Sequence, residues 1–295
     1  YQPGEITTQS SGSGSGSGSA IAYANNKIDA NRARHTCAIT DNGDLKCWGL
    51  DHNGQLGDGG ANTDTNAPSS TAIDLGTGRT ALQVVTGTQH TCAILDNGDM
   101  KCWGDDTYGQ LGDGGPAYSS ANPNANDLNA PSSTPINLGS GRTAVAASAG
   151  DYHTCAILDN GDLKCWGEDS AHGYGATNTD INAPLSTPID LGVGRTAVAV
   201  SAGNGHTCAI LDNGDLKCWG SDNYGQLGNG GSNIATNAPS STPIDLGTGR
   251  TAVAVSAGTS YTCAILDNGD LKCWGWDNKG QLGDGGTQHT TYTYT

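Results

Sequence analysis

The chain has 295 residues, of which 29 are acidic and 13 are basic, so its formal net charge at pH 7 is −16. This charge makes nucleic acid and anionic membrane surfaces poor partners, because they carry charge of the same sign. The sequence contains no apolar run long enough to span a bilayer. Phe is absent and Met occurs once among 46 Gly, so a core must be built from Val, Ile, Leu, Ala, Trp and cysteine.

The N-terminal segment, residues 1–19, is expected to form a short strand-like piece followed by a tether. Residues 11–19 alternate Ser and Gly, and a nine-residue coil of this kind reaches about 17 Å on average, or about 30 Å when extended. It can lay residues 1–8 on a sheet edge of the same molecule or of a neighbour. A disordered linker is the simpler alternative. Because the chain starts at Tyr1 without a signal segment, we expect a processed mature protein or a piece of a longer one.

Residues 20–286 carry five repeats, and each repeat contains one pair of cysteines. The first cysteines of successive repeats are 55, 63, 53 and 55 residues apart, a spacing typical of propeller blades or solenoid repeats. Together the pairs use all ten cysteines, which are Cys37 and Cys47, Cys92 and Cys102, Cys155 and Cys165, Cys208 and Cys218, and Cys263 and Cys273.

The segment between paired cysteines predicts a β-hairpin, with Asp-Asn-Gly between two β-friendly runs. A two-residue loop would pair Asp96 with Asp99 and bring like charges together. A three-residue loop, with Gly98 in the left-handed conformation, pairs Cys92 with Cys102. In this register the cysteines form a non-hydrogen-bonded pair with Cα atoms about 4.5 Å apart, which suits a cross-strand disulfide.

A zinc site is the alternative use for such cysteines, but the spacing disfavours it. Structural zinc ligands are typically about two to four residues apart, whereas nine residues separate these cysteines. A His precedes the Thr-Cys of four repeats, but Tyr261 stands there in the fifth. Five hairpin disulfides therefore predict an oxidising location, either extracellular or at the cell surface.

Each full repeat predicts four short strands, as in residues 251–258, 262–266, 271–275 and, in the preceding repeat, 241–246. Gly, Pro and Asn separate the strands, which is typical of an all-β propeller. The first inner strand is degenerate at Lys27–Ala30 or is replaced by residues 20–23. Residues 287–295 form a C-terminal tail in which 291–295 alternate at period two, so they predict a replacement strand.

The motifs His-Thr-Cys-Ala-Ile-Leu, Leu-Lys-Cys-Trp-Gly and Tyr224-Gly-Gln-Leu-Gly resemble the repeat of the regulator of chromosome condensation family. The resemblance implies a β-propeller, and family propellers commonly have about seven blades. The cysteine pair and the Trp are similar to the secreted prokaryotic branch of the family. Nuclear members act on chromatin and as exchange factors for a small GTPase. That function is not expected here, because this chain is acidic and has no basic tail.

The best candidates for a specific contact surface lie where the repeat is irregular. The second repeat has an insertion at residues 116–127, and Ala171–Gly175 replaces Gly-Gln-Leu-Gly in the third. Neutral drift in a tolerant loop is the alternative. The Trp that follows each second cysteine is expected in the core, on the face opposite the disulfides, whereas Trp276 occurs once. The candidate contact residues are Tyr118, His172, Tyr174, Trp276, Tyr292 and Tyr294.

We find no catalytic motif, so we expect neither an enzyme nor a cofactor. Some titratable loop residues do not recur from repeat to repeat, but their spacing matches no catalytic motif. These residues are His52, Asp105, Asp106, Glu168, Asp169, His172 and His289. Calcium binding is a weaker possibility. Carboxylate and amide oxygens around Asp51, Asp58 and Asp64 are of the type that binds calcium, but their pattern is more typical of solvated turns.

The sequence therefore predicts a non-catalytic extracellular propeller with a structural or adhesive role. Its expected partner is a second copy of itself or another molecule at the cell surface. The terminal segments either close the ring within one chain or join copies into a filament. The alternative function is a lectin-like module whose irregular loops bind a glycan or a protein.

Overall fold

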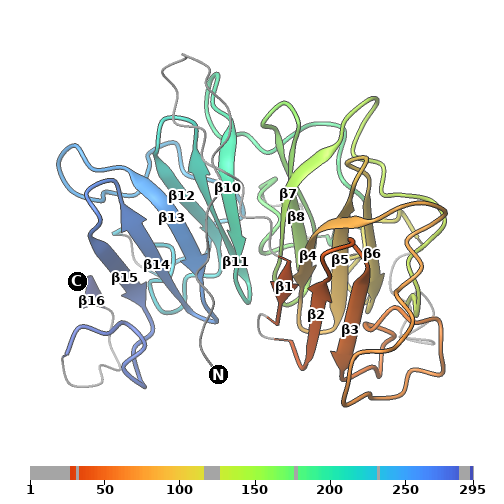
Figure 1. The fold of residues 1–295 in the computed structure, drawn as a ribbon. Helices are drawn as coiled ribbons and strands as arrows, with labels where there is room; N and C mark the ends of the chain where they lie inside the picture. The colour runs from red at the N-terminus through yellow and green to blue at the C-terminus, as the bar shows by residue number, and fades with distance from the viewer. Residues whose placement is uncertain are drawn as a thin grey trace.

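The computed structural model describes residues 27–30, 33–115, 127–175, 179–230, 233–285 and 293–294. Every regular element within these residues is a β-strand, and the strands form five antiparallel sheets. Figure 1 shows the sheets side by side in an arc, which confirms the predicted propeller architecture with five blades. None of the described segments forms a helix that could cross a membrane.

Each blade takes its strands in chain order, and the first strands of consecutive blades contact each other. Blade 1 contains β1 (Ile28–Asp29), β2 (His35–Ile39) and β3 (Leu45–Gly49). Blade 2 contains β4 (Ala81–Thr86), β5 (His90–Leu95) and β6 (Met100–Gly104), and blade 3 contains β7 (Ala144–Ala149), β8 (His153–Leu158) and β9 (Leu163–Gly167). Blade 4 contains β10 (Ala197–Ala202), β11 (His206–Leu211) and β12 (Leu216–Gly220), and blade 5 contains β13 (Ala252–Ala257), β14 (Tyr261–Leu266), β15 (Leu271–Gly275) and β16 (Thr293–Tyr294).

The hairpins adopt the predicted three-residue loop. In blade 2 the amide of Leu95 donates to the carbonyl of Asp99 at 2.9 Å, and Gly98 has a φ of 80°. Cys92 lies opposite Cys102 and the two form a disulfide with Cα atoms 4.1 Å apart. The other four pairs form the same cross-strand bond, and no described cysteine is free.

The predicted fourth strand is not regular in blades 1 to 4. There the outer segment makes one isolated β-bridge to the Gly that ends the third strand. The backbone amide of its Ile also donates to the carbonyl of the residue that begins the third strand, as Ile244 donates to Leu216 at 2.8 Å. In blades 2 to 4 a Pro stands directly before this Ile, as Pro243 does before Ile244, and it has no amide hydrogen to donate to a ladder.

The C-terminal tail supplies a true fourth strand to blade 5. Strand β16 pairs with β15, and Thr293 lies opposite Gly275, where the other blades make their isolated bridge. The predicted replacement strand is therefore confirmed for Thr293 and Tyr294. At the other end, β1 includes Ile28, whereas residues 1–26 lie outside the described part of the chain.

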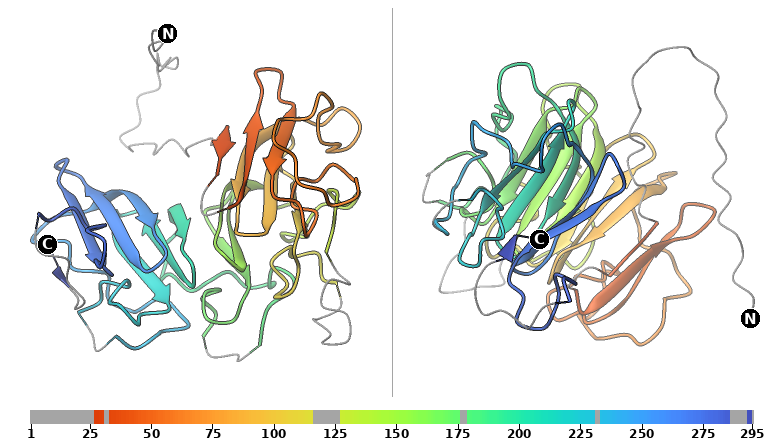
Figure 2. Two further views of the ribbon diagram at one scale, coloured as in Figure 1. Left: turned by 90° about the horizontal axis from the view of Figure 1, so that it is seen from below. Right: turned by 90° about the vertical axis from the view of Figure 1, so that its left-hand side faces the viewer.

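The core is divided into clusters that lie between consecutive blades. Four such clusters join blade 1 to 2, 2 to 3, 3 to 4 and 4 to 5. Strand contacts follow the same order. Figure 2 shows blades 1 and 5 at opposite ends of an open arc. Each inner blade is thus buried on two faces, whereas each end blade is buried on one.

Candidate functional site

The two faces of each hairpin have different roles, because side chains alternate along a strand. The disulfide face points toward the following blade, and the face that carries Trp points toward the preceding one. Trp103, Trp166 and Trp219 are fully buried, as expected for core residues. Trp48 in blade 1 is only half-buried, because no blade precedes it among the described residues.

Consecutive blades are joined by a recurring set of hydrogen bonds, which we call the blade junction. The Trp indole of the following blade donates to a loop carbonyl of the preceding blade, with Nε1 to oxygen distances of 3.0, 3.0, 3.0 and 2.9 Å. A Thr hydroxyl of the following blade donates to the same carbonyl at 2.8 or 2.9 Å. The donor pairs and acceptors are Thr91 and Trp103 with Gln55, Thr154 and Trp166 with Gln110, Thr207 and Trp219 with Ala171, and Thr262 and Trp274 with Gln226.

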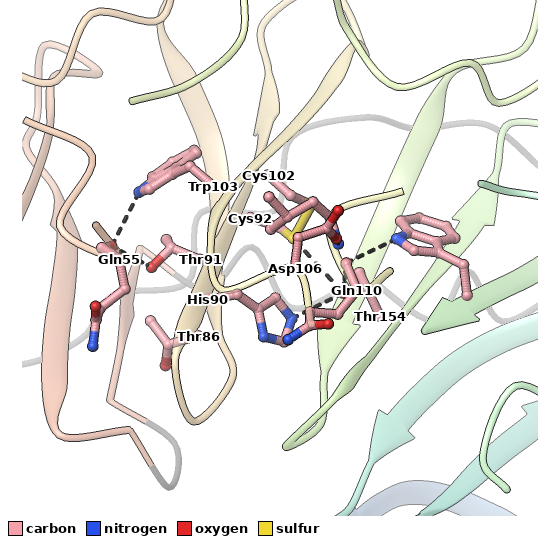
Figure 3. The surroundings of a disulfide bond; sticks show 12 residues. Gln55, Thr86, His90, Thr91, Cys92, Cys102, Trp103, Asp106, Gln110 and Thr154 are labelled. Carbon is pink, nitrogen blue, oxygen red and sulfur yellow. Dashed lines mark hydrogen bonds between the residues drawn. A yellow bond between two sulfur atoms is a disulfide. The ribbon is translucent and has the colours of Figure 1, made fainter. Parts of the chain in front are cut away.

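The recurring histidines belong to the blade junction. Figure 3 shows His90 pointing toward Thr154 of the next blade, with 2.9 Å between His90 Nε2 and Thr154 Oγ1. The Thr154 hydroxyl donates its hydrogen to Gln110, so it accepts from His90, which must carry its hydrogen on Nε2. Burial lowers the pKa of His90 to about 3 and that of His35 to about 4. These rings are therefore neutral at pH 7 and pack within the blade junction.

Loop carboxylates proposed as calcium ligands hold the backbone of their own loops. Asp51 accepts from the amide of Leu56 at 2.9 Å, and Asp64 accepts from the amide of Asp51 at 2.9 Å. Asp58 accepts from the amide of Gly60 at 2.7 Å. The described residues contain no group of three His, Cys, Asp or Glu side chains arranged to hold a metal ion.

The remaining titratable candidates belong to the loops of different blades and do not gather in one site. His52 lies 3.6 Å from Asp64 and both side chains are exposed, while Asp105 accepts hydrogen bonds from Thr107 and Gln110. Burial raises the pKa of Asp106 to about 7, and nearby carboxylates add to the shift. Burial also raises the pKa of Glu168 in the third blade. His289 lies outside the described residues.

The altered loop of the third repeat, Ala171–Gly175, packs mainly inside the molecule. His172 takes the place of Leu111 in the second repeat, and its side chain is fully buried. Its Nε2 lies 3.1 Å from a carboxylate oxygen of Asp169. Tyr174 packs against two of the core clusters, and burial raises the pKa of its hydroxyl. His172 thus offers no surface to a partner, and Tyr174 packs mainly into the core.

Among the contact candidates, Trp276 lies at the surface. Its ring stacks on that of Tyr224 from blade 4, with centroids 5.0 Å apart and planes inclined by 27°. Tyr224 is 37% exposed and Trp276 is half-buried, so the pair presents an aromatic surface to solvent. Tyr118 and Tyr292 lie outside the described residues, and Tyr294 is described only as part of β16.

Sequence reasoning missed the exposed apolar face of blade 5. Ile265 is 43% exposed and Leu271 is 65% exposed, although both occupy positions that are buried in blades 2 to 4. Val253 from β13 is 45% exposed. The local sequence gave no signal for this exposure, because the same motif is buried in blades 2 to 4.

The chain matches a known family over nearly its whole length. Residues 25–295 match the model of the RCC1-like domain. The ultraviolet-B receptor UVR8 of Arabidopsis thaliana is 28% identical over 255 residues, which cover 85% of this chain and 53% of the receptor. The mitochondrial RCC1 domain-containing protein RUG3 of the same plant is 29% identical over 257 residues, which cover 84% of this chain and 53% of RUG3. The chain therefore spans about half the length of the curated relatives it matches.

Solved structures show the same fold. Prp20p from Saccharomyces cerevisiae matches with a TM-score of 0.68 and 18% identity, over 88% of this chain and 61% of Prp20p. Human WBSCR16 matches with a TM-score of 0.67 and 21% identity, over 81% of this chain and 56% of that protein. The five blades thus match 61% of the Prp20p chain and 56% of the WBSCR16 chain.

Proposed function

The chain belongs to the RCC1-like domain family, and from this premise we propose that it is a non-catalytic binding scaffold with a structural or adhesive role outside the cytosol. The observation that carries the proposal is the use of all ten cysteines in hairpin disulfides. Disulfides persist in extracellular and cell-surface proteins and are rare where thiols are kept reduced.

Protein partners are supported by the family. The solved structure of Prp20p was reported together with its binding to Gsp1p and histones, so a propeller of this fold can serve as a protein-binding scaffold. The strong negative charge of the present chain argues for different partners from those of a histone-binding or nucleic-acid-binding protein. A non-catalytic role is supported by the repeated His and Asp side chains, which hold the blade junctions and loop backbones.

The proposed location is tested on native cells. Surface lysines such as Lys279 should react with a membrane-impermeant biotin ester before lysis. Intact mass after alkylation should show no modified cysteine without reductant and ten modified cysteines with it. Ten alkylated thiols in unreduced native protein, or biotinylation only after lysis, would overturn the proposal.

A glycan-binding function is the second candidate, and the stacked pair of Tyr224 and Trp276 is the observation that favours it. Exposed aromatic rings stack on the apolar faces of sugars. Trp276→Ala should abolish binding on a glycan array, whereas Tyr152→Ala, in the Tyr108 and Tyr152 pair, is the matched control. Absence of glycan binding by the unaltered protein would remove this candidate.

A further inference from the structure

The end face of blade 5 is one complete half of a blade junction. We call it the front face and define it by Tyr261, Ile265, Leu271, Gly283 and the carbonyl of Gln281. In blades 1 to 4 the residue equivalent to Gln281 supplies the carbonyl that accepts from Thr and Trp of the next blade. Ile265 is 43% exposed and Leu271 is 65% exposed, whereas the equivalent Ile210 and Leu216 of blade 4 are completely buried.

The backbone of the front face already has the shape that receives a Trp. Gly228 has a φ of 66°, and a Cβ atom there would lie 2.5 Å from Trp274 Nε1. Gly283 has a φ of 70°, but a Cβ atom there would meet no other atom within 4 Å. The loop therefore adopts its junction conformation without a neighbouring blade, so little reorganisation would be needed on binding.

The end face of blade 1 is the other half of the junction. We call it the back face and define it by Thr36, Ala38 and Trp48. All three are half-buried, whereas the equivalent Thr91, Ala93 and Trp103 of blade 2 are buried. The indole of Trp48 makes no hydrogen bond to any described residue, whereas the equivalent indoles in the other four blades all donate to a carbonyl.

We propose that the front face of one molecule binds the back face of a second copy, forming a fifth blade junction between chains. The two faces are at opposite ends of the arc (Figure 2), so they do not meet within one molecule. They are also different from each other, so the contact is head-to-tail. Such a contact builds a ring if the rotation closes and a filament if it does not.

Individual groups pair across this contact as they do inside the chain. Thr36 and Trp48 donate to the carbonyl of Gln281, as Thr262 and Trp274 donate to Gln226. Ser256 accepts from the amide of Ala30, as Ser201 accepts from the amide of Ala257 at 2.9 Å. One substitution marks the front face, because Tyr261 replaces the His of the other blades and stands where it would contact Thr36.

Net charge opposes this association, because each copy carries a formal charge of −16. Salt screens repulsion between like-charged molecules, with a Debye length of about 10 Å at 0.1 M. The contact itself is apolar and hydrogen-bonded, so it depends little on screening. Association should therefore strengthen as salt is added, the opposite of an association driven by charge attraction.

The test is sedimentation velocity of the full chain over a range of concentrations and salt. The unaltered protein should form oligomers whose size increases with protein concentration and with salt concentration. Leu271→Glu on the front face and Ala38→Glu on the back face should each weaken association by more than about tenfold, because each buries an unpaired charge. Val193→Glu is the control of equal charge, because Val193 is fully exposed in a loop.

A mixture of the two variants gives the sharpest result. Leu271→Glu keeps an intact back face and Ala38→Glu keeps an intact front face, so mixing them should produce dimers and nothing larger. Trp48→Ala is a second back-face variant, in case Ala38→Glu does not fold, and circular dichroism checks both. A monomeric unaltered protein, unchanged association of Leu271→Glu, or a mixture that gives no dimer would overturn the proposal.

The inference relies on the proposed structural role for its biological meaning, but its test is independent of that role. Deletion of residues 1–19 separates the two ways of joining copies. If the deletion abolishes association while Leu271→Glu leaves it unchanged, the N-terminal segment joins the copies. That result would overturn the proposed face contact but not the proposed function. Free thiols in native protein would overturn the extracellular function and leave the face contact standing.

Discussion

Blades 4 and 5 have almost the same sequence but very different environments. Strands β10 and β13 both read Ala-Val-Ala-Val-Ser-Ala, and β12 and β15 both read Leu-Lys-Cys-Trp-Gly. The side chain of Leu216 is completely buried, whereas that of Leu271 is 65% exposed. The hairpin conformation is the same in both, so the strands form from local sequence. Burial depends on whether a neighbouring blade is present.

The comparison predicts that identical substitutions have different costs in the two blades. Leu216→Ala should lower the free energy of unfolding by about 2–5 kcal/mol, because it leaves a cavity in the core cluster between blades 4 and 5. Leu271→Ala should cost less than about 1 kcal/mol in dilute monomer. Urea unfolding with the disulfides intact measures both. Equal losses would show that the front face of blade 5 is covered in solution.

A second pair of substitutions tests the glycine positions against which the Trp of the next blade packs. Gly228→Ala adds a clash with Trp274, which costs about 1–3 kcal/mol beyond the strain of a positive φ. Gly283→Ala carries only that strain, about 1–2 kcal/mol, because its Cβ meets open space. The difference between the two unfolding free energies is the quantity to measure. No difference would mean that the loop of blade 4 relaxes away from the indole.

A third pair tests the hydrogen bond of the junction. Trp219→Phe removes the bond to the carbonyl of Ala171, which still accepts from Thr207, and it leaves a space beside the smaller ring, so the loss should exceed the about 0.5–1.5 kcal/mol of the bond alone. Trp48→Phe should be close to neutral in the monomer, since its indole donates to no described residue. Thermal or urea unfolding distinguishes them. A larger loss for Trp48→Phe would contradict the assignment of blade 1 as an open end.

A comparison across pH separates the buried carboxyl of Asp106 from the exposed ones. Burial raises the pKa of Asp106 to about 7, so its contribution to stability is greatest below its ordinary value of 3.8 and is lost as pH rises through about 7. Asp106→Asn keeps an acceptor for the amide of Leu111 and stays neutral at every pH. The variant should therefore gain stability relative to the unaltered protein between pH 4 and pH 8.

The urea midpoints of the two proteins, compared at several pH values, measure this difference. The buried histidines act in the opposite direction, because their lowered pKa values remove stability as pH falls below about 6.5 toward about 3 or 4. They are common to both proteins, so their effect cancels in the difference. A constant difference across the range would mean that Asp106 is ionised throughout.

Hairpin structure was predictable because its determinants lie within about ten residues of each other. The Asp-Asn-Gly loop and the like charges of Asp96 and Asp99 exclude one register, and the other brings Cys92 opposite Cys102. The placement of Trp on the face opposite the disulfides follows from strand alternation alone. These features repeat in every blade because each depends only on its own repeat.

The candidate site was less predictable, because irregular sequence does not by itself indicate exposure. His172 departs from the repeat but replaces a buried Leu, and a carboxylate of Asp169 satisfies its ring. Trp276 is also irregular, yet it lies at the surface against Tyr224. Both residues are unique in sequence, and only their neighbours in space distinguish the two outcomes.

The sequence by itself determined the hairpin strands, the hairpin register, the disulfide pairs and the membership of the repeat family. These depend on backbone preferences and on contacts between residues close in the chain. Only the tertiary structure decided that the five blades form an open arc with two different end faces. Packing between blades joins residues that are far apart in the chain, as His90 and Thr154 are, and identical repeats cannot encode which of them will lack a neighbour.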